Sequence, residues 1–143
     1  MAKLPIIAVG FDHRGEQVAR ELFWHLSAHR VRAYLHEPIV VEDYAETAQK
    51  VLAFYPDGCI TVLICGTGVG MCIAANKVKG KRAAVIRSTE ELIHAVEHNN
   101  INVVCFGAMQ TSADQAFTIL QEGLQAKFLG GKYATRAKAI EDL

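Results

Sequence analysis

The segment VLICGTGVGMCIAANK, residues 62–77, decides the fold of this chain because its composition changes from that of a strand to that of a helix. An apolar run over residues 60–64 leads into Cys65, and an alanine-rich stretch of helical composition follows a short loop. The loop contains three glycines at alternate positions, Gly66, Gly68 and Gly70. This order predicts a buried strand, a tight turn and the start of a helix.

The glycine loop, residues 66–70, has the composition of an anion site. Glycine allows positive φ angles and lets backbone N–H groups approach a ligand closely. The helix that follows adds unpaired donors and the positive end of its dipole. Cys65 stands at the mouth of the loop, where the same field stabilises a thiolate. Cys65 is therefore a candidate base or nucleophile, although free cysteine is also common in protein cores.

The spacing of the glycines argues against two well-known nucleotide motifs. The loop reads G-x-G-x-G and follows the third expected strand, whereas dinucleotide-binding folds carry G-x-G-x-x-G after the first strand. No Gly-Lys-Ser/Thr sequence follows, so the loop is not a P-loop. A purely structural strand-to-helix turn stays open as the alternative to an anion site.

The composition indicates a soluble domain without a surface for nucleic acid or membranes. The chain has 143 residues, 51% of them hydrophobic, and carries 15 Lys and Arg against 15 Asp and Glu. A domain of this length buries roughly two-thirds of its unfolded surface. Balanced charge gives no general field that attracts nucleic acid or an anionic membrane, so we expect neither as a partner.

Cysteine spacing and hydropathy point to the cytoplasm. The four cysteines lie in or beside apolar runs and show no C-x-x-C spacing, which argues against a disulfide framework or a zinc knuckle. No stretch approaches the roughly 20 apolar residues of a membrane span. A reducing, cytoplasmic location is the expectation.

Five apolar runs alternate with amphipathic segments along the chain. The runs are continuous rather than alternating, which is typical of parallel strands covered on both faces. They span residues 5–10, 31–35, 60–64, 83–86 and 102–106. This alternation predicts an α/β fold with a Rossmann-like, doubly wound, five-stranded parallel sheet in a three-layer α/β/α sandwich. We expect a single domain over residues 1–143.

Helix signals fill the gaps between the apolar runs. Residues 88–91 and 112–115 have capping-box sequences, which predict the starts of two helices. An amphipathic helix is expected over residues 43–55, with Tyr44 in its buried stripe. A short terminal helix is expected over residues 135–143.

The carboxyl ends of the expected strands carry the polar residues of greatest interest. These ends present Asp12-His13, Cys65 with its loop, Arg87, and the residues from Gly107 onward. Ligands of open parallel sheets bind in the crevice outside the carboxyl ends of the strands. We therefore expect these residues to converge on one crevice.

A histidine pair gives a metal alternative. Residues 94–98 read His-Ala-Val-Glu-His and match the H-x-x-E-H pattern of some zinc enzymes. A catalytic zinc needs a third protein ligand, and this pair lies near the end of an expected crossover helix. We favour His94 as a surface residue and expect no metal site, with a zinc hydrolase using His94 and His98 as an alternative.

Motifs along nearly the whole chain carry a family resemblance. They are GFDHRG at 10–15, DYA at 43–45, ICGTGVGM at 64–71, IAANKV at 73–78, HNNINV at 98–103 and GG at 130–131. Together they resemble the ribose-5-phosphate isomerase B and galactose-6-phosphate isomerase family, whose patterns include Gly-x-Asp-His-x-Gly and His-Asn-x-x-Asn-Val. The glycine-loop motif is the most specific, whereas Ala45 replaces a proline of the family.

The resemblance implies cofactor-free aldose–ketose isomerisation of a sugar phosphate, of the ribose 5-phosphate to ribulose 5-phosphate type, through a cis-enediolate. Cys65 is implied as the base that moves a proton between C1 and C2. Some relatives use a glutamate as the base where this chain has Met71. Because this chain lacks that glutamate, the resemblance favours Cys65 as the base. Thr67 and the loop N–H groups are implied to stabilise the enediolate, and His98, assisted by Asp12, to open the sugar ring.

The resemblance also implies binding residues and a partner subunit. The implied substrate-binding residues are His13, Gly66, Gly68, Gly70, Asn99, Lys132 and Arg136. In the family the site lies between two subunits, so a homodimer or a tetramer is implied, with residues 130–143 as a tail that packs on a partner. No cofactor and no metal are implied.

Departures from the family pattern concern the phosphate end of the site. Met109 stands where relatives usually carry arginine, and Lys132-Tyr133 where they carry Arg-His. Arg14 and Arg87, which follow expected strands, are candidate replacements for the lost guanidinium groups. The substrate therefore stays open among tetrose, pentose and hexose phosphates. The alternative function is a catalytically silent sugar-phosphate-binding or regulatory subunit of the same fold.

Overall fold

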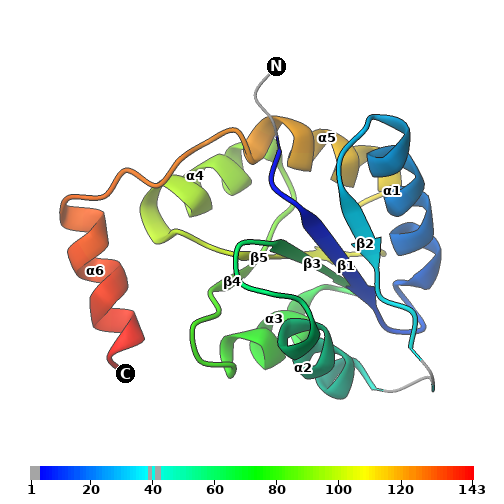
Figure 1. The fold of residues 1–143 in the computed structure, drawn as a ribbon, viewed down its shortest axis with the longest axis horizontal. Helices are drawn as coiled ribbons and strands as arrows, with labels where there is room; N and C mark the ends of the chain where they lie inside the picture. The colour runs from blue at the N-terminus through cyan, green and yellow to red at the C-terminus, as the bar shows by residue number, and fades with distance from the viewer. Residues whose placement is uncertain (1–3, 39, 41–42) are drawn as a thin grey trace.

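The computed structural model describes residues 4–38, 40 and 43–143. Within these residues five strands form one sheet (Figure 1). They are β1 (Ile7–Phe11), β2 (Ala33–Leu35), β3 (Ile60–Cys65), β4 (Ala83–Val85) and β5 (Val103–Gly107). Their order is β2-β1-β3-β5-β4 and every neighbouring pair is parallel. The predicted five-stranded parallel sheet is confirmed.

Helices cover both faces of the sheet. α1 (Glu16–Ala28), α4 (Thr89–Asn99) and α5 (Ala113–Gly123) lie on one face, and α2 (Tyr44–Phe54) and α3 (Val69–Asn76) on the other (Figure 1). Each face has its own hydrophobic cluster. This is the predicted three-layer α/β/α sandwich. No helix in the described ranges is both long and apolar enough to cross a membrane.

The strands are apolar on both sides because each side meets a helix layer. Along β3, Val62 and Ile64 pack toward α1, α4 and α5, while Leu63 and Cys65 face α2 and α3. Alternate residues of a strand point to opposite faces, and both sets are buried here. The Cys65 side chain is therefore directed toward the α2 and α3 layer.

The winding of the chain reverses between β1 and β3. From β1 the chain moves outward through α1 to β2 and then crosses to β3 on the other side of β1. Ligands of doubly wound sheets bind at such a switch point, outside the carboxyl ends of the strands. There the N–H of Asp12, after β1, donates to the Ile64 carbonyl of β3 over 3.2 Å. This places the loops after β1 and β3 side by side.

Two local predictions are wrong in detail. Tyr44 is 45% exposed rather than buried, because it lies in the first turn of α2, beyond the stripe that packs on the sheet. At α4 the Ser88 hydroxyl accepts the N–H of Glu91, but the Glu91 carboxylate accepts from Arg87 rather than from Ser88. Only half of that capping box forms. The box over residues 112–115 forms completely.

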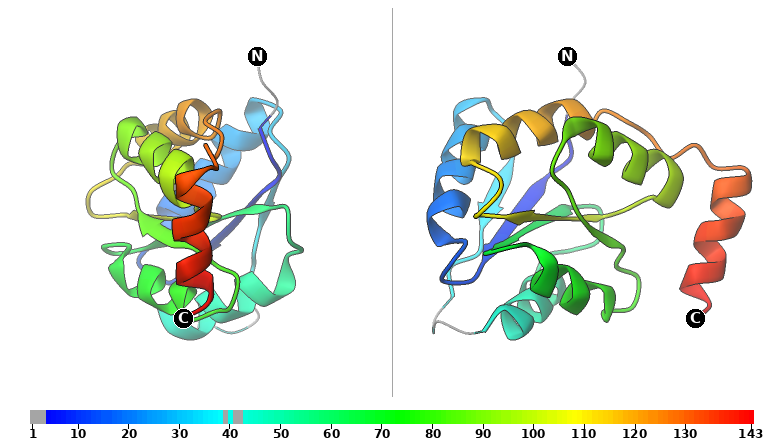
Figure 2. Two further views of the ribbon diagram at one scale, coloured as in Figure 1. Left: turned by 90° about the vertical axis from the view of Figure 1, so that its left-hand side faces the viewer. Right: turned by 180° about the vertical axis from the view of Figure 1, so that it is seen from behind.

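The terminal helix α6 (Lys132–Glu141) begins three residues earlier than predicted, directly after Gly131. It has no buried residue and stands apart from the sheet on the side of α4 (Figure 2). Among its contacts with the rest of the chain, the Leu129 N–H donates to the Glu97 carbonyl over 3.0 Å, and Arg82 pairs with Glu141 at 2.7 Å. A cavity of about 900 Å³ separates α6 from the start of β4.

Candidate active site

The glycine loop holds Cys65 by a hydrogen bond from its own backbone. The N–H of Gly68 donates to the Cys65 sulfur over 3.2 Å, and the residue is only 4% exposed. An N–H donor of this kind stabilises negative charge on sulfur. Position 68 requires glycine, because its φ is +82° and a Cβ atom there would lie 3.1 Å from the Phe106 carbonyl carbon.

Thr67 adds a hydroxyl to the rim of the loop. The N–H of Val69 donates to its Oγ1 over 3.3 Å, and the residue is exposed. Because the oxygen accepts this bond, the hydroxyl proton can be donated to a ligand. The loop thus offers a thiol, a hydroxyl and backbone N–H groups at the start of α3.

The loop after β5 is fastened to the glycine loop. The N–H of Ala108 donates to the Cys65 carbonyl over 2.8 Å, and the N–H of Met109 donates to the Gly66 carbonyl over 3.0 Å. Both carbonyls are therefore satisfied within the protein, which leaves the N–H side of the loop to face a ligand. The Met109 side chain is 71% exposed at this rim.

Two side chains from other elements lie against the glycines. The Tyr44 ring packs on Gly70, where a Cβ atom would lie 2.7 Å from a ring carbon. The Arg14 side chain crosses Gly66, where a Cβ atom would lie 3.1 Å from Arg14 Cδ and 3.4 Å from a guanidinium nitrogen. Reasoning from sequence missed Tyr44, although the Asp43-Tyr44 pair of the family motif was the signal that could have found it.

Asp12 organises the loop after β1. Its Oδ1 accepts the N–H groups of Arg14 at 2.9 Å and Gly15 at 3.0 Å, and the residue is buried, with 6% exposed. This is the local turn that an aspartate forms with the backbone two and three residues on. The carboxylate fixes the direction in which Arg14 and His13 leave the sheet.

His13 lines a small cavity beside this turn. The cavity has a volume of about 150 Å³ and also contacts Asp12 and the ion-paired Arg20. Arg20 contacts Glu37 at 2.6 Å and Glu16 at 2.9 Å, and its hydrogen bond holds the pKa of the Glu37 carboxyl below its usual value. Arg20 is thus committed to carboxylates, whereas the exposed His13 is open to a ligand.

A second group of predicted site residues gathers around Tyr133. The His98 ring stacks on the Tyr133 ring, with centroids 4.3 Å apart and planes inclined by 13°. Lys132 Nζ lies 5.2 Å and Arg136 Cζ lies 5.7 Å from the centre of the same ring, within the range of cation–π attraction. Asn99 follows His98 and is exposed. Sequence analysis identified Tyr133 only as a departure from the family pattern and did not predict it as the centre of this group.

These two groups do not meet within one chain. Cys65 ends β3, whereas α4 runs back from the carboxyl edge of the sheet and brings His98 to the amino edge, where Asn102 and Arg82 hydrogen bond before β5 and β4. A six-residue strand such as β3 separates the two edges by about 17 Å. Arg87 lies at the carboxyl edge but follows the outer strand β4, two strands from β3.

The pair His94 and His98 has its rings 4.0 Å apart, and His98 is engaged with Tyr133. Among residues 4–38, 40 and 43–143, no three His, Cys, Asp or Glu side chains form a group that could hold a metal ion.

A thiol pair lies behind the glycine loop. A hydrogen bond between the thiols of Cys72 and Cys105 lowers the pKa of Cys72 to about 7. The same bond and burial raise the pKa of Cys105. Cys72 is half-buried on α3 and Cys105 is fully buried on β5. Cys72 is thus the more acidic thiol of this pair.

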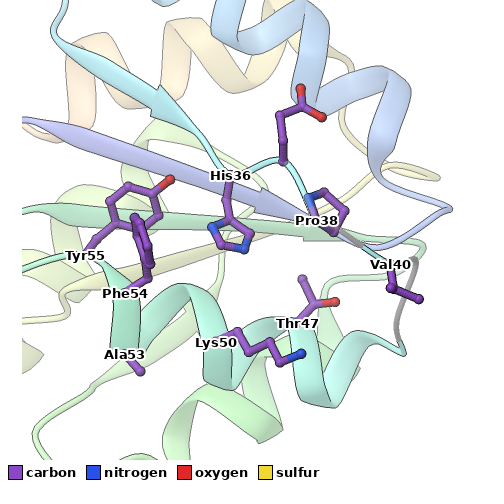
Figure 3. A pocket seen from close by; sticks show the side chains of 9 residues that line it. His36, Pro38, Val40, Thr47, Lys50, Ala53, Phe54 and Tyr55 are labelled. Carbon is purple, nitrogen blue, oxygen red and sulfur yellow. The ribbon is translucent and has the colours of Figure 1, made fainter.

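A larger cavity lies elsewhere. It has a volume of about 700 Å³ and lies between the segment after β2 and α2, with His36, Phe54 and Tyr55 on one side and Thr47 and Lys50 below (Figure 3). Its walls are mainly apolar, and neither Cys65 nor the glycine loop lines it. We place the candidate active site at the glycine loop, which carries the thiol, the hydroxyl and the backbone N–H donors, rather than at this cavity.

Comparison with known proteins shows the family to which this chain belongs. The family model described as Ribose/Galactose Isomerase matches residues 7–140. The chain is 35% identical to ribose-5-phosphate isomerase B of Escherichia coli K12 over 138 residues, covering 94% of this chain and 93% of that protein. It is also 35% identical to D-erythrulose-4-phosphate isomerase of Pectobacterium atrosepticum over 115 residues, covering 71% and 76%.

The fold comparison gives the same result. The crystal structure of ribose-5-phosphate isomerase B from Mycoplasma genitalium, with bound ribulose-5-phosphate, superposes with a TM-score of 0.83. The two chains are 32% identical, and the match covers 96% of this chain and 94% of that one. With a family model over nearly its whole length, relatives above 30% identity and the same fold, this chain is a member of the ribose/galactose isomerase family.

Proposed function

We propose that this protein interconverts the aldose and ketose forms of a sugar phosphate without a cofactor, with Cys65 as the base. The observation that carries the proposal is the Cys65 thiol, which accepts the Gly68 N–H inside a loop of backbone donors. Membership of the isomerase family supports the reaction class. The donor loop supports an intermediate that carries negative charge on oxygen.

The proposed reaction moves one proton at carbon. The Cys65 thiolate removes the proton from C2 of the open-chain aldose, and the electron pair shifts to the carbonyl to give a cis-enediolate. The loop N–H groups that are not already bonded to Cys65 or Thr67, together with the Thr67 hydroxyl, stabilise the enediolate oxygens. The thiol returns the proton to C1, the electron pair of the double bond forms the new bond to hydrogen, and the hydroxyl proton at C2 passes to the negative oxygen on C1, which leaves the ketose. Cys65 ends as the thiolate, so the cycle closes.

Ring opening is assigned to the second group of residues. His98 as general acid and base would open the cyclic sugar, and Lys132 and Arg136 carry positive charge beside it. Because this group lies at the opposite edge of the sheet from Cys65, we propose that a second copy of the chain supplies it. The exposed helix α6, with residues 130–143, is the part that would pack on that copy.

The relatives indicate a range for the number of carbon atoms in the sugar rather than a single value. One relative is named for a pentose phosphate and another for a tetrose phosphate. A solved relative holds ribulose-5-phosphate. We propose a phosphorylated sugar of four to six carbons as the substrate.

The test is hydrogen exchange in heavy water, followed by NMR, at C2 of aldose phosphates and at C1 of ketose phosphates of four to six carbons. The proposal expects one of them to exchange with the wild-type protein and none with Cys65→Ala. Exchange that persists in Cys65→Ala would remove Cys65 as the base. Binding without any exchange would instead identify a silent sugar-phosphate-binding subunit, which the exposed Met109 at the loop rim favours as the second candidate.

A further inference from the structure

Arg14 brings a cationic side chain against the glycine loop. Its side chain lies across Gly66, with Cδ 3.1 Å and a guanidinium nitrogen 3.4 Å from the position of a Cβ atom there. The Met109 sulfur lies 3.8 Å from the same position. The guanidinium therefore lies on the rim between the loops after β3 and β5, one residue from the proposed base.

The direction of Arg14 is set by the backbone. Asp12 Oδ1 accepts the Arg14 N–H at 2.9 Å, and the Gly15 N–H donates to both Oδ1 and the carbonyl oxygen of Asp12. Gly15 lies directly against the Ile64 carbonyl, so no side chain fits there. These contacts hold the turn against β3 and direct Arg14 over the glycine loop.

The guanidinium has no partner of opposite charge in the described part of the chain. Arg20 and Arg82 both pair with glutamates, at 2.6 Å and 2.7 Å, whereas the Arg14 side chain makes no ion pair or hydrogen bond with residues 4–38, 40 and 43–143. The residue is exposed. An unpaired guanidinium beside a loop of N–H donors provides two parallel donors, which match the oxygens of a phosphate.

We propose that Arg14 binds the phosphate group of the substrate and thereby sets substrate affinity. This inference rests on the proposed function, because it assigns the phosphate end of the same site. The enediolate already has the loop N–H groups and Thr67 as donors. The guanidinium lies outward of them, beside the exposed Met109, where the far end of a bound sugar phosphate would emerge.

Arg87 is the matched control. It is an exposed arginine at the same edge of the sheet, but it follows β4, which β5 separates from β3. Strands lie about 4.8 Å apart, so the start of the Arg87 side chain is about 10 Å from the line of β3. Removing Arg87 changes the net charge by the same amount as removing Arg14.

The experiment measures kcat and KM for the substrate found by exchange, and the inhibition constant of inorganic phosphate. We expect Arg14→Ala to raise KM and the phosphate inhibition constant about tenfold to a hundredfold, with kcat within about threefold of wild type. Arg14→Lys should recover only part of the loss, because an ammonium offers no fork. Arg87→Ala should change both constants less than twofold.

A relocated guanidinium sharpens the test. Because Arg14 and Met109 flank the same point above Gly66, the double variant Arg14→Ala, Met109→Arg should restore most of the phosphate affinity. A loss of kcat in Arg14→Ala without any change in KM or phosphate inhibition would overturn the proposal, since Arg14 would then act on the enediolate. Equal losses in Arg14→Ala and Arg87→Ala would also overturn it, as a general charge effect.

Failure of the proposed function gives a different result. If the wild-type protein catalyses no exchange, phosphate binding is measured directly by ³¹P NMR line broadening of inorganic phosphate. Weaker binding in Arg14→Ala than in Arg87→Ala then still supports the phosphate site, and equal binding rejects it. Circular dichroism and melting of each variant show that the fold is kept, as expected for an exposed side chain.

Discussion

The ring of His98 lies flat on the ring of Tyr133, with centroids 4.3 Å apart. This stack joins the end of α4 to the first turn of α6, two elements that otherwise share few contacts. Offset or tilted aromatic pairs of this kind contribute about 0.5–1.5 kcal/mol. The stack therefore fixes the direction of an imidazole that we assign to ring opening.

A tetrose phosphate separates ring opening from proton transfer. The O4 atom of an aldotetrose 4-phosphate carries the phosphate, so this sugar cannot form a five-membered ring. We expect His98→Ala to lower turnover of a pentose phosphate by about a hundredfold, the usual contribution of a general acid or base, and that of a tetrose phosphate by less than tenfold. Initial rates with both sugars check this, and equal losses would remove His98 from ring opening.

Tyr133→Ala should act in the same direction as His98→Ala but more weakly. Loss of the stack leaves the imidazole in place on α4 while freeing its orientation. We expect a loss of about tenfold with a pentose phosphate, in line with one lost aromatic contact. Tyr133→Phe keeps the ring and serves as the control, with rates within about twofold of wild type. A loss as large in Tyr133→Phe as in Tyr133→Ala would show that the hydroxyl, not the stack, matters.

Complementation tests whether the two groups come from different chains. As pure proteins, Cys65→Ala should be inactive with a pentose phosphate and His98→Ala should keep about one hundredth of wild-type turnover. After unfolding and refolding together in equal amounts, half of the dimers are mixed and one of their two sites is intact, so about a quarter of wild-type activity should return. Each variant refolded alone is the control. Absence of recovery would place both groups in one chain.

Gly68→Ala should destabilise the protein and remove activity. At this position φ is +82° and the new Cβ would lie 3.1 Å from backbone atoms of β5, which cannot easily move. Strain of this kind costs about 1–3 kcal/mol. Gly80 is a matched control, because its φ is +83° but no atom lies within 4 Å of a Cβ there. Denaturant unfolding and C2 exchange should show a smaller stability loss and intact activity for Gly80→Ala.

The Cys72 thiol should react with iodoacetamide at unusually low pH. Its pKa is lowered to about 7 by the hydrogen bond with Cys105, and only the thiolate reacts. The alkylation rate should therefore rise through pH 7 and level off above about pH 8. In Cys105→Ala the bond is lost, the pKa of Cys72 rises, and the rate at pH 7 falls. Mass spectrometry identifies the labelled residue, with Cys72→Ser as the control. An unchanged pH profile in Cys105→Ala would contradict the assigned cause.

The fold and half of the site could be predicted from sequence because their signals are local. The strand before Cys65 and the glycines after it are contiguous, and alternation of apolar runs with helices is enough to predict a parallel sheet. The stack of His98 on Tyr133 and the path of Arg14 over Gly66 join residues more than thirty positions apart. Such contacts depend on how side chains pack in three dimensions, and the hydrophobic periodicity of the sequence does not predict that packing.

Tyr44 shows how a periodicity rule can mislead. The rule assigns a tyrosine in the apolar stripe to the core, yet this one lies in the first turn of its helix, beyond the edge of the sheet. There its ring covers Gly70 instead of the core. The prediction was wrong because the rule describes the middle of a helix better than its ends.

The bare surface of α6 has a consequence for how this protein behaves on dilution. A ten-residue helix without a buried side chain is only marginally stable in water. If a second copy packs against it, its order is tied to protein concentration. Specific activity should then fall below a threshold concentration, together with a part of the helical circular dichroism signal, and return when the protein is concentrated. The activity per protein molecule would then depend on the protein concentration as well as on the substrate concentration.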